Sequence, residues 1–348
     1  MTVFDCVKIS LDMLNNKRIL ITGSSGFIGS HLVNYLLQSY ENIHIIGIDN
    51  MNDYYDVSLK ESRLKKLVDL NKDYTFINGD ISDRDFIDEL FNNNQFDIVV
   101  NLAAQAGVRY SIENPDVYIK ANIIGFYNIL EAVRNHPVEH FVYASSSSVY
   151  GGNTKIPFST DDKTDNPVSL YAATKKTDEL LAHTYSHLYG IKSTGLRFFT
   201  VYGPYGRPDM AYYSFTDKLL NNEKIKVFNY GKCERDFTYI DDIVEGIIRI
   251  LDKGPIDNYN LYNIGNNHPE NLLDFIHTLA DCLIENGLLT SNFNIDEHIE
   301  LTELALGDVP VTYADTSKLE DDYGFKPNTS LKQGLNNFVK WYKDYHNK

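Results

Sequence analysis

The stretch KRILITGSSGFIGSHLVNYLLQ, residues 17–38, joins an apolar strand to a helix through a turn with three glycines. Gly23, Gly26 and Gly29 have the spacing GxxGxxG. Without side chains there, backbone N–H groups and the positive end of the helix can approach a pyrophosphate. A tight turn that needs glycine only for its backbone would give the same spacing. The stretch therefore predicts the first strand and helix of a parallel sheet, with a dinucleotide site as one of two interpretations of the turn.

Apolar strands and helices alternate from this turn as far as residue 199. We expect strands at 17–23, 43–49, 74–80, 96–104, 140–146 and 193–199. We expect helices at 27–38, 59–70, 85–91, 115–134 and 169–190. Apolar strands interleaved with helices are typical of a parallel sheet covered on both faces. The pattern therefore predicts a Rossmann-type doubly wound α/β fold.

The alternation breaks after residue 200, where 201–213 is rich in Gly, Pro and Tyr. Two later stretches, 237–251 and 259–265, have patterns that could return to the sheet. The expected units are a leader at 1–16, a dinucleotide-binding domain at 17–200 plus about 235–265, and a smaller discontinuous α/β substrate lobe at about 201–234 plus 266–348. Small ligands commonly bind between two such units.

Acidic residues at the ends of two predicted strands support the dinucleotide interpretation. Asp49 stands 20 residues beyond Gly29, where a carboxylate can accept both hydroxyls of an adenosine ribose and repel a 2′-phosphate. This favours NAD over NADP. Asp80 ends the third strand and could meet the adenine or simply cap a turn. The small residues of segment 101–104 would let a nicotinamide ribose pass close to the backbone.

The second half of a catalytic centre lies in YASSSS and SLYAATKK. Tyr171 and Lys175 are four residues apart on one predicted helical face, and Ser146 stands 25 residues before Tyr171. A phenol acts as a base at neutral pH only if positive charge stabilises its phenolate, and an ammonium beside an oxidised nicotinamide could supply that charge. A serine hydroxyl could relay the proton of a substrate alcohol. Such pairs also occur on ordinary amphipathic helices, so the combination with the glycine turn is what favours catalysis.

Composition narrows the class of partner. The chain has 32 Lys and Arg against 48 Asp and Glu, a net charge of −16, which disfavours a broad surface for nucleic acid or anionic membrane. Cys6, Cys233 and Cys282 lack the spacing of a zinc site or disulfide framework. No uncharged run reaches the roughly 18 residues of a membrane span. We expect a cytoplasmic protein with no metal, nucleic-acid or membrane partner.

With these motifs the chain resembles the extended short-chain dehydrogenase/reductases, and within them the UDP-glucuronate 4-epimerases. The resemblance runs from about residue 17 to the C-terminus through TGSSGFIGSHL, GIDNMNDYYDVSLKESRL, NLAAQAGVRYSIENPDVY, YASSSSVYG, SLYAATKK, LRFFTVYGPYGRPDM and RDFTYIDDIVEG. It implies that Tyr171 takes the proton of a sugar 4-hydroxyl as hydride passes to tightly held NAD. The 4-keto sugar then turns and is reduced on its other face, converting UDP-glucuronate to UDP-galacturonate.

The resemblance also implies a role for individual residues and a homodimer built on helices 115–134 and 169–190. The implied catalytic residues are Tyr171, Lys175 and Ser146. The implied cofactor contacts are Gly23, Gly26, Phe27, Ile28, Gly29, Asp49, Asn50, Asp80, Ile81, Leu102, Ala103, Ala104, Asn122, Tyr171 and Lys175. The implied UDP-sugar contacts are Ser146, Ser147, Ser148, Thr200, Arg207, Phe228, Arg235 and Asp308.

Two features separate this branch from its relatives. Related dehydratases and decarboxylases carry an acidic residue after the catalytic Ser or Thr, where Ser147 and Ser148 stand here. A 4-keto uronic acid is a β-keto acid that loses CO2 readily, so an epimerase must hold the carboxylate in a resistant orientation. The resemblance implies Arg207 for this task, with a solvated loop arginine as the alternative. Arg109 could face either the substrate or solvent.

Other functions remain compatible with the sequence. Many UDP-sugar epimerases have an arginine where this chain has Ala305, which places more of the diphosphate binding on Arg235. The small Thr312 leaves room for N-acetylated sugars. The alternatives are therefore a UDP-glucose or UDP-N-acetylhexosamine 4-epimerase, a UDP-glucuronate decarboxylase and, from another class, a non-catalytic NAD-sensing protein.

Overall fold

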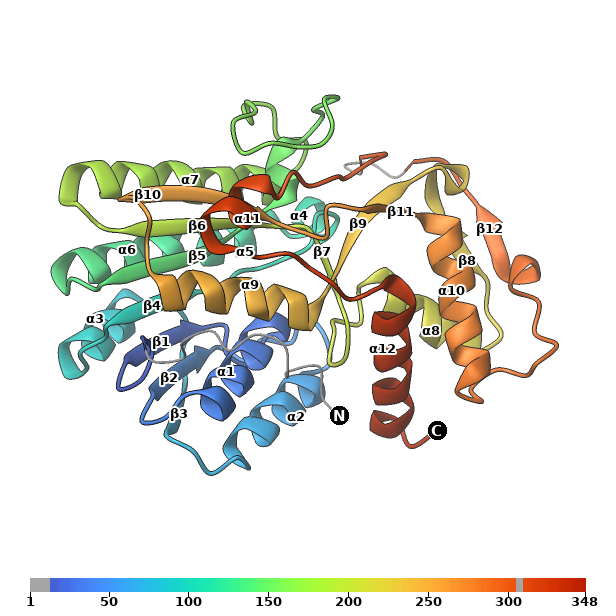
Figure 1. Ribbon diagram of the computed structural model, residues 1–348, viewed down its shortest axis with the longest axis horizontal. Coiled ribbons are helices and arrows are strands. Elements are labelled where there is room, and N and C mark those ends of the chain that lie inside the picture. Colours follow the sequence, from blue (N-terminus) through green and yellow to red (C-terminus); the bar gives the residue numbers. More distant parts are fainter. Residues whose placement is uncertain (1–12, 305–308) are drawn as a thin grey trace.

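The computed structural model describes residues 13–304 and 309–348 (Figure 1). Its strands are β1 (Arg18–Thr22), β2 (His44–Asp49), β3 (Tyr74–Asn78), β4 (Ile98–Asn101), β5 (His140–Ser146), β6 (Ser193–Phe198), β7 (Thr200–Tyr202), β8 (Ile225–Val227), β9 (Glu234–Tyr239), β10 (Tyr259–Ile264), β11 (Pro269–Asn271) and β12 (Ile299–Leu301). Its α-helices are α1 (Phe27–Ser39), α2 (Val57–Val68), α3 (Arg84–Asn93), α4 (Tyr110–Glu113), α5 (Pro115–Tyr118), α6 (Phe126–Asn135), α7 (Leu170–Tyr189), α8 (Ala211–Leu220), α9 (Ile240–Lys253), α10 (Leu272–Glu285), α11 (Ser317–Tyr323) and α12 (Leu331–Tyr345). A π-helical turn spans Ile119–Gly125, and short 3-10 helices span Ser147–Tyr150, Phe228–Gly231 and Ile295–His298.

Seven parallel strands form the main sheet, in the order β10-β6-β5-β4-β1-β2-β3. The chain builds outward from β1 to β3 and then returns to β4 and builds outward on the other side. The strand order therefore reverses between β1 and β4. In open sheets of this kind, ligands bind beside the reversal at the carboxyl ends of the strands. The Rossmann-type doubly wound fold predicted from the sequence is confirmed.

Both faces of the main sheet are buried because the strands are apolar on both sides. On β1, Ile19 and Ile21 belong to a cluster with α1 and α9, whereas Leu20 belongs to a second cluster with α3, α6 and α7. Each of the three side chains is fully buried and contributes roughly 1.5–3 kcal/mol of transfer free energy. Figure 1 shows these helices on opposite sides of the sheet. The two layers hold the strand ends in fixed register.

The helix that carries Tyr171 and Lys175 has well-defined ends. Ser169 caps the start of α7, because its hydroxyl accepts a hydrogen bond of 3.1 Å from the backbone N–H of Ala172. Gly190 ends the helix in the left-handed conformation, with φ of +69°. The predicted helix 169–190 is therefore found almost at its expected bounds. Tyr171 lies in the first turn, beside the carboxyl end of the sheet.

The predicted continuous helix at 115–134 is interrupted by the π-helical turn Ile119–Gly125. The amide of Asn122, inside this turn, binds both the N–H and the C=O of Gln105, at 2.8 and 3.1 Å. Gly125 lies so close to Ile81 that an added Cβ would come within 2.5 Å of its side chain. The widened turn therefore follows from contacts with distant segments, which the local helical pattern does not contain.

The smaller part of the molecule contains the three-stranded sheet β11-β9-β7 and the strand pair β12-β8, with α8, α10 and α12. Of the two stretches expected to return to the main sheet, 259–265 forms its edge strand β10, paired with β6. The other stretch, 237–251, contributes to two different elements. Its beginning forms part of β9 in the smaller sheet, and its remainder forms α9, which packs against α1.

Candidate active site

A cavity of about 870 Å³ opens at the carboxyl ends of β1, β2, β4 and β5, beside the reversal of strand order. Segments of both parts of the molecule line it. Every described residue that the sequence predicted for the site lines this cavity, with the exception of Asn122. Asp308 lies outside the described residues. A cavity of this size lies within the range of ligand-binding clefts, roughly 300–1,000 Å³.

The glycine turn forms one end of the cavity. Gly23 has φ of +69°, and an added Cβ would come within 2.9 Å of the backbone nitrogen of Ala103. At Gly29 a Cβ would come within 2.2 Å of the carbonyl oxygen of Gly23. The helix that follows starts at Gly26 with neither a capping side chain nor an acidic residue in its first turn. Its N–H groups therefore suit an anion such as a pyrophosphate, and the residues present fit a dinucleotide.

Asp49 lies next to this turn and is buried. Its carboxylate accepts hydrogen bonds from the N–H of Ser25 at 3.2 Å and of Met51 at 2.9 Å. Lys60 Nζ lies 3.7 Å from Asp49 Oδ1 and donates to Asn52 Oδ1 at 3.0 Å. Burial lowers the pKa of Lys60, although Asp49 opposes the shift. Lys60 is not among the predicted site residues and stands on the buried stripe of α2.

The wall beyond β3 and β4 contains the remaining predicted cofactor contacts. Asp80, Ile81 and the segment 102–104 all line the cavity. Asn122 lies behind this wall and is 1% exposed. It donates to the hydroxyl of Thr174 at 3.0 Å and holds the backbone of Gln105, which itself lines the cavity. Asn122 thus shapes the wall from behind.

Tyr171 and Lys175 line the cavity from the start of α7. Lys175 is 2% exposed, and its Nζ donates to the carbonyl oxygen of Ala144 at 3.0 Å and to Asp178 Oδ2 at 3.3 Å. Burial raises the pKa of Asp178 to about 7, against the attraction of Lys175. The ammonium is thus held by two oxygen atoms, one helical turn along α7 from Tyr171.

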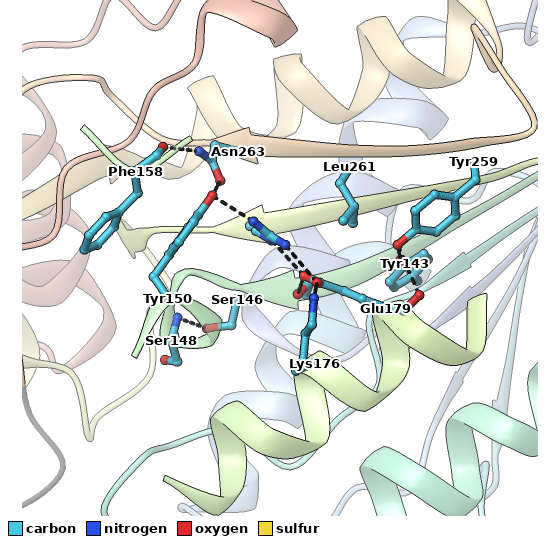
Figure 2. Close-up of polar contacts among 12 residues, drawn as sticks. Tyr143, Ser146, Ser148, Tyr150, Phe158, Lys176, Glu179, Tyr259, Leu261 and Asn263 are labelled. Atoms are coloured by element: carbon cyan, nitrogen blue, oxygen red, sulfur yellow. Dashed lines mark hydrogen bonds and ion pairs between the residues drawn. The ribbon is translucent and has the colours of Figure 1, made fainter. Parts of the chain in front are cut away.

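The serine run separates into different environments. Ser145 donates its hydroxyl to the carboxylate of Glu179 at 2.6 Å. Ser146 accepts from the N–H of Ser148 at 3.2 Å, as Figure 2 shows, and caps the short 3-10 helix. Ser146, Ser147 and Ser148 all line the cavity. Ser145 lines the cavity as well, but its hydroxyl is engaged by Glu179, so the structure leaves Ser146 compatible with the predicted proton relay.

A buried ion pair stands behind the serines. Arg197 on β6 binds the Glu179 carboxylate with two hydrogen bonds, of 2.8 and 2.9 Å, and donates to the hydroxyl of Tyr150 at 3.0 Å. Tyr150 in turn donates to Asn263 at 2.6 Å, and Asn263 donates to the carbonyl oxygen of Phe158 at 2.7 Å (Figure 2). This network joins α7 to the loop that carries Phe158, a cavity-lining residue.

The predicted sugar contacts Thr200, Arg207, Phe228 and Arg235 line the other end of the same cavity. Arg235 donates to the carbonyl oxygen of Pro310 at 3.0 Å. The guanidinium of Arg109 lies 4.4 Å from the centre of the Phe228 ring, so it belongs to this wall. Cavity-lining residues without a predicted role include Asn52, Tyr54, Tyr55, Lys60, Gln105, Asp209, Lys218, Lys226 and Cys233.

Arg207 binds Asp209 through two hydrogen bonds, Nε to Oδ1 at 3.0 Å and Nη2 to Oδ2 at 2.9 Å. It is therefore partly neutralised by a carboxylate of its own loop.

The described residues contain no cluster of three or more His, Cys, Asp or Glu side chains that could bind a metal ion. Within the same residues, no helix has the length and apolar character needed to cross a bilayer.

The fold and the site define a dinucleotide-dependent enzyme. The model of the NAD dependent epimerase/dehydratase family matches residues 19–265, so the chain belongs to this family and its cofactor is NAD. The resemblance predicted from the motifs is confirmed.

Individual relatives support this assignment. Protein CapI of Staphylococcus aureus is 50% identical over 95% of this chain and 100% of that protein. UDP-glucuronate 4-epimerase 2 of Arabidopsis thaliana is 44% identical over 95% of this chain and 77% of its own length. The crystal structure of UDP-glucuronic acid 4-epimerase from Bacillus cereus, in complex with UDP-glucuronic acid and NAD, has a TM-score of 0.84 and 33% identity, covering 94% of this chain and 99% of that one.

Proposed function

We propose that this protein is an isomerase that interconverts UDP-glucuronate and UDP-galacturonate by NAD-dependent inversion at C4 of the sugar. The single observation that carries the proposal is the composition of one cavity, in which the glycine turn, the Tyr171–Lys175 pair and Arg207 meet. The relatives that match 94–95% of this chain include several proteins named UDP-glucuronate 4-epimerase.

The residues of the glycine turn and Asp49 would hold the cofactor. The uncapped start of α1 offers N–H groups to its pyrophosphate, and the Asp49 carboxylate suits the adenosine ribose. When bound, NAD supplies a hydride acceptor and donor at the carbon that is inverted. Lys175, already fixed by Ala144 and Asp178, lies where it can contact the ribose next to the nicotinamide.

Tyr171 is the proposed acid and base. It accepts the proton of the sugar 4-hydroxyl and returns it to the 4-oxygen after the keto sugar has turned. The positive charge of Lys175 stabilises the phenolate while the proton is away. Ser146 donates to the same oxygen and holds it during both steps. The sugar must present its two faces in succession, so Thr200, Phe228 and Arg235 are proposed to anchor the UDP end only.

Arg207 is proposed to bind the carboxylate of the uronic acid. Loss of CO2 from the 4-keto sugar requires the C5–carboxylate bond to align with the π system of the ketone. An arginine that holds the carboxylate out of this alignment suppresses the loss. The hydroxyls of Ser147 and Ser148 occupy the wall at which related dehydratases and decarboxylases have a carboxylate, which favours epimerisation over those reactions.

One observation favours a second candidate substrate. Thr312 lines the cavity and is a small side chain, fixed by a hydrogen bond of 3.2 Å from the N–H of Asp236. It leaves space for a larger sugar substituent, so a UDP-N-acetylhexosamine is the alternative substrate. Arg207 weighs against this alternative, because a neutral sugar offers it no carboxylate.

The test uses the purified protein with UDP-glucuronate and no added cofactor. We expect UDP-galacturonate, detected by proton NMR, because the protein retains its NAD through the turnover. Tyr171→Phe should keep its NAD and lose turnover by about 100-fold or more. Formation of CO2 and a UDP-pentose by the wild-type protein would replace the proposal with a decarboxylase. Turnover of UDP-N-acetylglucosamine without turnover of UDP-glucuronate would show that the substrate is a UDP-N-acetylhexosamine.

We further propose that the protein forms a homodimer through α6 and α7. These helices lie side by side on one face of the sheet (Figure 1). Their region exposes large apolar side chains, with Ile124 at 45%, Tyr127 at 41%, Leu180 at 57% and Leu188 at 59%. A second copy would cover this surface by forming a four-helix bundle.

A cytoplasmic location is proposed as well, since Cys233 and Cys282 are free thiols.

A further inference from the structure

The loop that carries Arg207 is held by residues of the dinucleotide-binding half. This loop, residues 203–210, contains two left-handed backbone conformations, at Gly203 with φ of +144° and at Tyr205 with φ of +58°. A non-glycine residue in that region costs free energy, so other contacts must stabilise the loop. The contacts come from residues 54–63, immediately after the Asp49 segment.

Arg63 on α2 provides the backbone contacts. It is 1% exposed, and its guanidinium donates to the carbonyl oxygen of Tyr205 at 3.1 and 2.5 Å and to that of Ser25 at 3.1 Å. Ser25 belongs to the glycine turn. Arg63 also donates to the hydroxyl of Tyr55 at 2.6 Å. Arg63 thus binds both the glycine turn, at Ser25, and the loop 203–210, at Tyr205. Tyr205 stands two residues before Arg207.

Tyr54 provides the side-chain contact. Its hydroxyl donates to Asp209 Oδ2 at 3.2 Å, and the same oxygen accepts from Arg207 Nη2 at 2.9 Å. Burial, aided by the negative charge of Asp209, raises the pKa of Tyr54 to about 12, so the hydroxyl stays a donor at neutral pH. Burial opposes the ionisation of Asp209, but Arg207 and Tyr54 outweigh it and leave the pKa of Asp209 below its ordinary value.

The orientation of Arg207 depends on this contact for a geometric reason. A guanidinium has five N–H donors in one plane, and Asp209 engages the Nε and Nη2 edge. The donors left for a substrate carboxylate therefore point in directions that Asp209 sets. The charge of Arg207 also interacts with Tyr171, which together with Asp209 and Tyr54 raises the pKa of Arg207 against burial.

We propose that Tyr54 is a positioning residue for uronate selectivity, which fixes Asp209 and, through Asp209, directs the free donors of Arg207 at the substrate carboxylate. This inference rests on the proposed function, because only a uronic acid offers that carboxylate. Tyr54 belongs to the dinucleotide-binding half, in the segment that follows Asp49. The segment next to the proposed ribose-binding residue therefore also sets the orientation of Arg207.

A misdirected Arg207 has a chemical signature. In the 4-keto sugar, the bond between C5 and the carboxylate carbon breaks and its electron pair forms the C4–C5 enolate. CO2 leaves, and C5 takes a proton from solvent to give a UDP-4-keto-pentose, whose ketone would take back the hydride removed in the first step, so that a UDP-pentose is released and the cofactor is restored. The step needs no oxidant or reductant, because the ketone formed during the epimerisation accepts the electron pair. The ratio of CO2 to UDP-galacturonate therefore reports how well the carboxylate is held.

The experiment compares Tyr54→Phe with the wild-type protein and with Tyr262→Phe, using UDP-glucuronate labelled with ¹³C in the carboxylate. Tyr262 is the matched control, because its hydroxyl also donates to an aspartate, Asp322, at 2.6 Å, but away from the cavity. We expect Tyr54→Phe to raise the ratio of CO2 to UDP-galacturonate about tenfold, the effect of one hydrogen bond to a charged group. Tyr262→Phe should leave the ratio unchanged.

A second comparison separates positioning from general destabilisation. Asp209→Asn should raise the same ratio, and adding Tyr54→Phe to it should have no further effect, because Tyr54 acts through Asp209. An active wild type with an unchanged ratio in Tyr54→Phe would overturn this inference alone. Equal ratios in Tyr54→Phe and Tyr262→Phe would do the same. A wild type inert towards UDP-glucuronate would overturn the proposed function and this inference with it.

Discussion

At the scale of single residues, the pair formed by Lys175 and Asp178 makes folding depend on pH. Asp178 is fully buried, and burial raises its pKa to about 7 although Lys175 Nζ lies 3.3 Å away. The unfolded chain releases this proton near pH 4, whereas the folded protein keeps it until about pH 7. Between these values the folded state binds more protons than the unfolded state. The contribution of Asp178 to stability is therefore greatest at low pH and is lost as the pH rises from about 4 to about 7.

Asp178→Asn removes this titration. We expect the unfolding free energy of the wild type, relative to the variant, to fall with rising pH by at most about 1.4 kcal/mol per pH unit until about pH 7. Urea unfolding at several pH values between about 5 and 8 measures the difference. Asp88→Asn, in the exposed pair with Arg84 on α3, is the matched control and should give a constant difference. A constant difference for Asp178→Asn as well would contradict the prediction.

At the scale of elements, the start of α1 requires glycine for packing as well as for binding. A Cβ on Gly29 would meet the carbonyl oxygen of Gly23 at 2.2 Å, so Gly29→Ala must displace the turn that faces the cofactor. We expect at least tenfold less NAD to remain on the purified protein, measured by absorbance after acid release. Gly190→Ala, at the end of α7, has open space around it and should cost about 1 kcal/mol of stability with its NAD retained. Full NAD content in Gly29→Ala would contradict this account.

Local patterns predicted the elements that local forces determine. The strands of the main sheet are apolar runs because both of their faces are buried, and α7 has its own capping residues, Ser169 and Gly190. The π-helical turn at 119–125 was not predictable, because its causes are contacts with Gln105 and Ile81. The predicted site residues that stand in short motifs also line one cavity, because each motif lies at the end of a strand or the start of a helix. The contact between Tyr54 and Asp209 joins residues 155 positions apart, so no motif could indicate it.

At the scale of the whole molecule, the proposed dimer rests on the exposed apolar side chains of α6 and α7. We expect Leu180→Lys to convert the dimer to a monomer, because a buried ammonium at the centre of the bundle would lack a partner. Sedimentation velocity measures the change. Leu301→Lys on β12 is the matched control, since Leu301 is similarly exposed at 50% on a different part of the surface. A wild type that sediments as a monomer at micromolar concentration would contradict the dimer.

The buried network of Glu179, Arg197, Tyr150 and Asn263 gives α7 a rigid mechanical connection to the rest of the protein (Figure 2). Sliding the helix along the sheet would break several charge-assisted hydrogen bonds at once, each of them shielded from water. In the proposed reaction the base on this helix would therefore keep its place relative to the sheet while a nucleotide sugar enters and its epimer leaves.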